Sequence, residues 1–171
     1  LHHVSAAEED LHDWKVGSNP SIVDYLKVNS GLLEDKATDW ERAILAIVAA
    51  EENPRDFGEV NYVDRLLDFY VDTQIGDESL LNDDFWGILA LISAGESQSS
   101  EIITNSVTFI KDNQNADDGW GLAVGGDSDA DDTAAAVSAL IAAGESPTSD
   151  TIVHALDYIK SQQQNNGGFA S

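Results

Sequence analysis

Residues 109–144, FIKDNQNADDGWGLAVGGDSDADDTAAAVSALIAAG, run from the end of an amphipathic segment through a loop rich in glycine and aspartate into a segment of small apolar residues. The apolar residues on both sides of the loop recur with helical spacing, so the stretch predicts a helix, a loop and a second helix. Asp131 and Asp132 can cap the free N–H groups at the start of the second helix, and Gly144 can end it in a left-handed conformation.

The same unit recurs along the chain. One type of helix carries an aromatic or apolar pair near its end, and the other type is richer in small side chains. The pairs are Tyr25-Leu26, Phe69-Tyr70, Phe109-Ile110 and Tyr158-Ile159, and the small-residue segments are 43–50, 87–94 and 136–143. Equivalent positions lie about 40 to 50 residues apart, a period typical of helical repeat proteins.

The two types of helix differ in polarity. Residues 101–112 are apolar along one stripe and polar opposite it, whereas residues 133–143 are apolar nearly all round. We therefore expect an all-α fold, a partial α/α-toroid of stacked antiparallel hairpins with four outer and three inner helices. Residues 20–171 would form this repeat domain and residues 1–19 an N-terminal arm. The last outer helix ends where another inner helix would follow, so we expect a piece of a longer array.

Composition restricts the function. The chain of 171 residues carries 8 Lys and Arg against 32 Asp and Glu, a net charge of −24 that repels nucleic acid and anionic membranes. No apolar run is long enough for a transmembrane helix. Cysteine is absent, which excludes thiolate nucleophiles and cysteine-ligated zinc. The expected partner is a small ligand or a protein, and we expect an extracellular or cell-surface location, with a cytoplasmic one left open.

The glycine- and aspartate-rich loop is the place where function is expected. The separation of Phe109 from Ala139 exceeds the corresponding separations in the two earlier units, Tyr25 to Ala46 and Phe69 to Ala90. About nine residues are therefore added at this one loop of an otherwise regular scaffold, and lengthened loops are where repeat proteins usually carry function.

A known pattern overlies the loop. Phe109-Ile110, Gln114 and Gly119-Trp120 resemble the QW repeat of squalene and hopene cyclases, which recurs in prenyltransferase-like α/α-toroid proteins. Asp118 stands where that family usually has its first glycine. A second copy is similar and has a phenylalanine in the tryptophan position: Tyr158-Ile159, Gln163, Gly167 and Phe169. The resemblance implies a structural role, in which the glutamine bridges two helices and the aromatic ring covers the joint, for Gln114, Trp120, Gln163 and Phe169.

Residues 128–134, SDADDTA, resemble the DxDD-T-A signature of class II terpene cyclases. The resemblance implies that Asp131 is the general acid that protonates an alkene or epoxide, with Asp129 and Asp132 supporting it. Clustered carboxyls suit this chemistry because like charges a few ångström apart cannot all ionise. An aspartate at a helix start is, however, also an ordinary N-cap, and a chain of this length is too short to enclose a polycyclic product.

Calcium is a further possibility for the loop. Asp127, Asp129 and Asp131 alternate as in calcium-binding loops, and oxygen ligands suit this hard cation. An EF-hand does not fit, because Asp132 stands at the glycine position and Ser138 at the glutamate position. A looser Ca²⁺ site stays open, and no other cofactor is expected.

Three functions follow from the sequence. The favoured one is a non-enzymatic toroid-repeat module that binds a ligand or partner through the glycine- and aspartate-rich loop. The alternatives are a fragment of a class II terpene cyclase with Asp131 as its acid, and a structural repeat stabilised by calcium.

Overall fold

Two layers of helices make up the part of the chain that the computed structural model describes, residues 10–29, 33 and 36–169. The α-helices there are α2 (Ile22–Val28), α3 (Ala37–Ala49), α4 (Tyr62–Leu67), α5 (Asn82–Ser93), α6 (Glu101–Asp112), α7 (Ala130–Ala142) and α8 (Asp150–Ser161). A 3₁₀ helix, η1 (Leu11–Asp13), and two short strands, β1 (Tyr70–Val71) and β2 (Gln74–Ile75), complete the elements.

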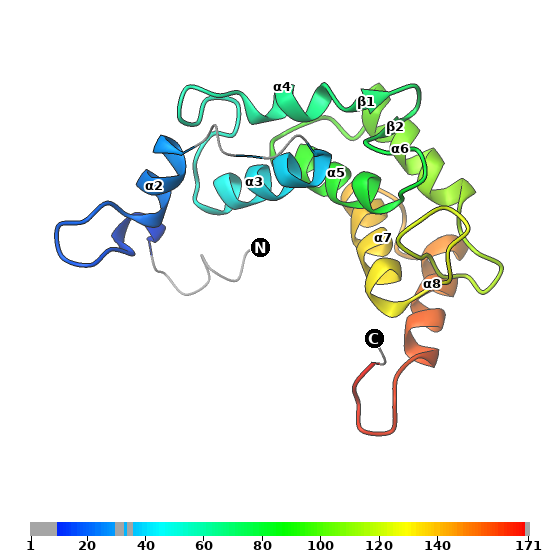
Figure 1. Cartoon of the computed structure of the whole chain (residues 1–171). Helices are drawn as coiled ribbons and strands as arrows, with labels where there is room; N and C mark the ends of the chain where they lie inside the picture. The colour runs from blue at the N-terminus through cyan, green and yellow to red at the C-terminus, as the bar shows by residue number, and fades with distance from the viewer. Residues whose placement is uncertain (1–9, 30–32, 34–35, 170–171) are drawn as a thin grey trace.

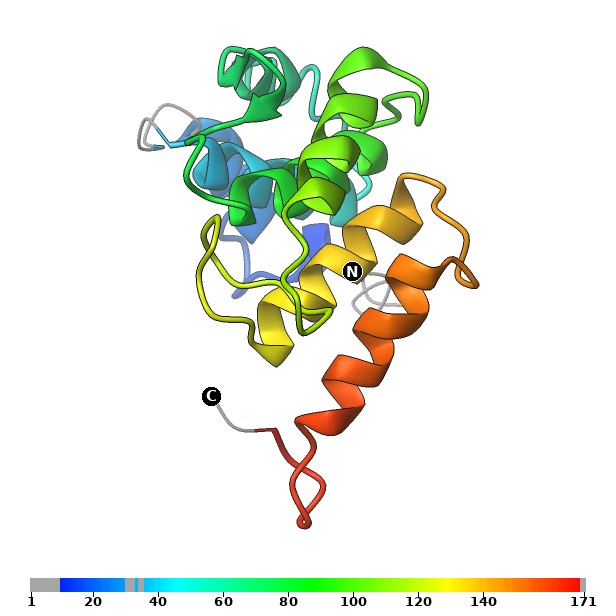
Figure 2. The ribbon, with the colours of Figure 1, turned by 90° about the vertical axis from the view of Figure 1, so that its right-hand side faces the viewer.

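The helices form an inner and an outer arc (Figure 1). Helix α5 packs between α3 and α7 in the inner layer, and α4, α6 and α8 each pack on the inner helix of their own hairpin. Figure 2 shows α7 and α8 side by side as one such hairpin. The prediction of an all-α, partial α/α-toroid built of outer and inner helices is confirmed.

The core lies between the two layers. Its largest fully buried side chains include Ile44 of α3, Phe85 and Leu91 of α5, and Leu140 of α7. Small residues bring the inner helices together, since Ala90 and Ala139 are completely buried. None of the described helices has the length and apolar character that crossing a membrane requires.

Ala46 differs from its two counterparts, because it is exposed. The repeat predicts a buried position here, and that expectation is wrong. Helix α3 is the first inner helix in the described residues, and the side of α3 that carries Ala46 borders a surface groove next to Leu26 and Tyr62. A position that a neighbouring inner helix covers in α5 and α7 therefore stays open in α3.

A short β-hairpin replaces the expected end of the second outer helix. Helix α4 ends at Leu67, and Tyr70 and Val71 then pair with Ile75 and Gln74 in an antiparallel sheet. Asp72 takes a left-handed conformation, with φ of 57°, to make the tight turn. The prediction that an outer helix carries the Phe69-Tyr70 pair near its end is therefore wrong, since Phe69 lies in a turn after α4 and Tyr70 lies in β1.

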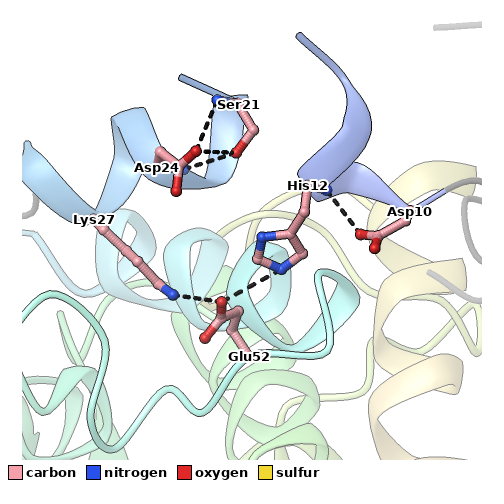
Figure 3. Close-up of polar contacts among 6 residues, drawn as sticks. All are labelled: Asp10, His12, Ser21, Asp24, Lys27 and Glu52. Carbon is pink, nitrogen blue, oxygen red and sulfur yellow. Dashed lines mark hydrogen bonds and ion pairs between the residues drawn. The ribbon is translucent and has the colours of Figure 1, made fainter. Parts of the chain in front are cut away.

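A side-chain contact joins the described part of the N-terminal arm to Glu52, which lies just after α3 (Figure 3). His12 Nε2 lies 3.4 Å from Glu52 Oε1, which also pairs with Lys27 of α2. Asp24 closes a capping box with Ser21 at the start of α2. Residues 1–9 of the expected arm lie outside the described residues, and the boundary between arm and domain stays a prediction.

Candidate functional site

The loop between α6 and α7 is held closed by its own polar groups. Asn115 Nδ2 donates to Gly126 O and to Ser128 Oγ, at 2.9 Å each, and Ser128 Oγ donates to Asp117 Oδ1 at 2.7 Å. A Cβ atom at Gly121 would lie 2.2 Å from the carbonyl oxygen of Asp127, so the two strands of the loop approach closely only because residue 121 is glycine.

Trp120 lies at the centre of the joint between α6 and α7. Its side chain is fully buried, and its indole N–H donates to the carbonyl of Ile110 at 2.8 Å. Its backbone N–H donates to Thr133 Oγ1 at 3.0 Å, and its carbonyl accepts from Asp129 N at 3.1 Å. One residue thus ties the end of the outer helix to the start of the inner one.

The glutamines of the QW-like copies hold the same turn. Gln114 Nε2 donates to Asp118 O at 2.9 Å and to Thr151 O, in the first turn of α8, at 3.4 Å. Gln163 Nε2 makes the corresponding bond to Gly167 O at 3.0 Å, and Phe169 is 47% exposed. Both glutamines thus bond the turn that follows their helix, and the structural role predicted for the two copies stays a prediction.

Sequence reasoning missed a third copy. Gln74 Nε2 donates to Gly76 O at 3.1 Å, and Gln74 follows Phe69 at the spacing that separates Gln114 from Phe109. That spacing was the signal available in the sequence. The tryptophan position, six residues after the glutamine, is Leu80 in this copy, and the missing tryptophan concealed it.

The three aspartates of the DxDD-like signature lie in different surroundings. Asp129 is the N-cap of α7 and accepts the backbone N–H of Asp132 at 2.8 Å. Asp131 is exposed to solvent in the first turn of α7. Asp132 is half-buried, and this burial, followed by the hydrogen-bonded carboxyl of Asp129 and the charges of Asp129 and Asp131, raises the pKa of Asp132 to about 6. Asp132 therefore keeps a proton to a higher pH than an aspartate with the ordinary pKa of 3.8.

Helix α8 covers one side of the loop. The hydroxyl of Tyr158 donates to Ser128 O at 2.7 Å, and His154 Nδ1 lies 3.5 Å from Asp118 Oδ1. Burial and the charges of Asp117 and Asp129 raise the pKa of Tyr158, so the phenol stays a donor. The loop is therefore fixed by α8 as well as by its own internal hydrogen bonds.

Residues 122–124 of the loop also pair with residues 79–82, in the segment that leads into α5. Leu81 N donates to Leu122 O at 3.0 Å, and Val124 N donates to Ser79 O at 2.9 Å. These bonds flank an antiparallel pair, Leu80 and Ala123. The loop thus forms a short backbone ladder with the segment that leads into α5. No side-chain pattern in the sequence predicts this contact.

This docking creates a groove. An open depression of about 760 Å³ lies between the β-hairpin turn, the segment before α5, the loop and α6. Its apolar residues are Val71, Phe109 and Val124, and its acidic residues are Asp72 and Glu78. Val71 is 55% and Val124 43% exposed, so both apolar side chains are presented to solvent. None of the aspartates of the DxDD-like signature lines this groove.

A family comparison covers the same region. A model of the squalene-hopene cyclase C-terminal domain matches residues 84–171, from the first turn of α5 through both QW-like copies. This match spans half of the chain. The chain belongs to the squalene-hopene cyclase C-terminal domain family. A comparison with curated proteins gave no significant match.

In this cyclase-type domain, most of the loop's polar groups are engaged within the fold. The carboxyls of Asp117 and Asp129 each bond a neighbouring donor, and the backbone of residues 122–124 is paired. The arrangement can hold a proton on Asp132 and can present the Val71–Phe109–Val124 groove. The family match itself shows fold and ancestry and leaves the reaction open.

The residues predicted to bind calcium do not form a preformed ligand arrangement in the described part of the chain. In the described part of the chain, no three histidine, aspartate or glutamate side chains are placed to hold a metal ion. Asp127 and Asp131 are exposed, and Asp129 is engaged as the helix cap. A Ca²⁺ site at these three residues stays a prediction, and a melting temperature that is the same in Ca²⁺ and in EDTA would end it.

Proposed function

We propose that the chain is a non-enzymatic binding module of the cyclase-type fold, extracellular or at the cell surface, whose glycine- and aspartate-rich loop forms one wall of a partner-binding groove. The observation that supports it most is the docking of residues 122–124 on residues 79–82, which uses the inserted segment to build the Val71–Phe109–Val124 groove. Insertions that build a rigid concave surface are typical of binding sites.

The groove suits a partner with both apolar and cationic side chains. Three apolar side chains line it, and the carboxyls of Asp72 and Glu78 stand at its side on a chain of net charge −24. Complementary charge speeds association and discriminates between partners, whereas the buried apolar contact supplies most of the affinity. An extended peptide that alternates lysine with valine carries both features.

An NMR titration of the ¹⁵N-labelled chain with such a Lys-Val peptide tests the proposal. We expect amide shifts concentrated in residues 71–79 and at Phe109 and Val124, and weak or no binding of a Lys-Ser peptide. Val124→Asp should weaken binding of the Lys-Val peptide about tenfold or more, because it removes an apolar contact that is worth about 1.5 kcal/mol or more.

Val153→Asp is the matched control. Val153 is also exposed, at 41%, but it lies on α8 outside the groove, and the variant adds the same negative charge. It should leave the affinity within about twofold of the unaltered chain. Equal binding of the Lys-Val and Lys-Ser peptides, or equal effects of the two variants, would show only nonspecific attraction to an acidic surface and would contradict the proposal.

A second candidate function is that of a class II terpene cyclase fragment. The raised pKa of Asp132, about 6, favours it, since a carboxyl that keeps its proton can act as an acid. We would incubate the chain, and a longer protein containing it, with squalene and with geranylgeranyl diphosphate and analyse the products by mass spectrometry. Cyclised products that disappear in Asp131→Asn or Asp132→Asn would establish the cyclase, and their absence from both proteins would exclude it.

A further inference from the structure

Three carboxyl groups lie in the core between the first two hairpins. Glu41 of α3 and Asp84 of α5 are fully buried, and Asp83 of α5 is 7% exposed. Neither carboxyl oxygen of Glu41 has a hydrogen-bond partner in the described residues, and Oδ2 of Asp84 also lacks one. Buried carboxylates without partners are strongly unfavourable, so these groups need a proton or another positive charge.

The packing around Glu41 leaves little room for rearrangement. A Cβ atom at Gly87 of α5 would lie 3.5 Å from Glu41 Oε1 and 2.6 Å from the side chain of Ile75, so glycine allows α5 to approach both α3 and β2 here. Asp84, one turn earlier on α5, accepts the N–H of Ile75 at 3.1 Å through Oδ1. The cluster therefore lies where α3, α5 and the β-hairpin meet.

In the geometry observed, the three carboxyls of this cluster can be neutralised by binding protons. No three acidic or histidine side chains in residues 10–29, 33 and 36–169 are placed to hold a metal ion. Burial, followed by the charges of Asp83 and Asp84, raises the pKa of Glu41 to about 9, and Arg42 on its own helix acts weakly in the opposite direction. Burial raises the pKa of Asp84 to about 7, against the effect of Ser106 and the Ile75 N–H. Burial also raises the pKa of Asp83, which Asp77 faces.

The sign of the resulting pH dependence follows from linkage. The folded state binds protons more tightly than the unfolded state, whose glutamates titrate near the ordinary value of 4.5. Stability is therefore greatest below about pH 4.5 for this group and falls as the pH rises towards 9. Between those limits, the equilibrium constant for opening rises about tenfold per pH unit for each proton that only the folded state retains.

The effect is expected to be local. Helix α3 packs on α5 and α4, whereas α7 packs on α5 and α8, so the two ends of the stack depend on different contacts. Repeat arrays with contacts between neighbours alone can open at one end while the other end stays folded. We propose that protonated Glu41, with Asp83 and Asp84, locks α3 onto α5, and that loss of its proton at alkaline pH releases α3 and α4 while α7 and α8 stay packed.

Hydrogen exchange of the whole chain at several pH values tests this lock. After correction for the intrinsic pH dependence of exchange, amides of residues 37–49 should lose about tenfold in protection per pH unit between pH 6 and pH 8, and amides of residues 130–142 much less. Glu41→Gln should remove the greater part of this slope in residues 37–49. Asp157→Asn, which removes one exposed charge from α8, should not change it.

Two outcomes would overturn the proposal. One is an equal loss of protection in residues 37–49 and 130–142, and the other is an unchanged slope in Glu41→Gln. If Glu41→Gln does not fold, a ¹³C titration of the Glu41 carboxyl in the unaltered chain decides. A midpoint in the alkaline range supports the lock, and a midpoint like that of an exposed glutamate overturns it.

Discussion

Trp120→Ala is expected to lower the free energy of unfolding by about 3–5 kcal/mol, the usual cost of removing a buried tryptophan. The side chain is fully buried, and its loss leaves both a cavity and the carbonyl of Ile110 without the indole donor. Denaturant unfolding followed by circular dichroism measures the loss, and thermal melting should show a midpoint about 10 °C or more lower.

Phe169→Ala is the matched control for this variant. Phe169 takes the tryptophan position of the last QW-like copy, but it is 47% exposed. Its removal should cost about 1 kcal/mol or less. If the two variants lose stability equally, or if Trp120→Ala is neutral, the closing role that we assign to Trp120 is wrong.

The helices were the predictable part of the fold, because each rests on local chemistry. The buried inner helices are recognisable from their runs of small apolar residues. The cap of α7 was predicted wrongly, because its N-cap is Asp129, and Asp131 and Asp132 lie in the first turn of the helix. The hairpin at residues 70–75 was missed because two-residue strands are too short for a period of two to show.

The candidate site was predictable only in part. The signature at residues 128–134 locates the aspartates, and the family match covers them. Their exposure depends on the path of the loop, so the sequence could not show that Asp131 is solvent-exposed and Asp132 half-buried. Glu41 is a further example, since a single glutamate in an apolar helix gives no sign of whether it reaches the surface.

The groove was not predictable, because it depends on backbone pairing between distant segments. Leu122 and Val124 bond Leu81 and Ser79 through main-chain atoms, which any residue except proline can supply. The side chains of Leu122 and Val124 are exposed and give no pattern of burial. The binding function that we propose therefore rests on a contact that only the folded structure shows, and that contact can be tested separately from any partner.

A crosslink between residues 80 and 123 tests that contact most directly. Leu80 and Ala123 are opposite each other between two backbone hydrogen bonds, the position in an antiparallel pair where side chains come closest. The chain has no native cysteine, so Leu80→Cys with Ala123→Cys offers a single disulfide. We predict that it forms on mild oxidation and stabilises the fold by about 2–4 kcal/mol relative to the reduced form. If the two thiols stay free under oxidation in the folded protein, or if the disulfide forms only with loss of stability, the loop does not dock on the preceding connection and the groove that we propose does not exist.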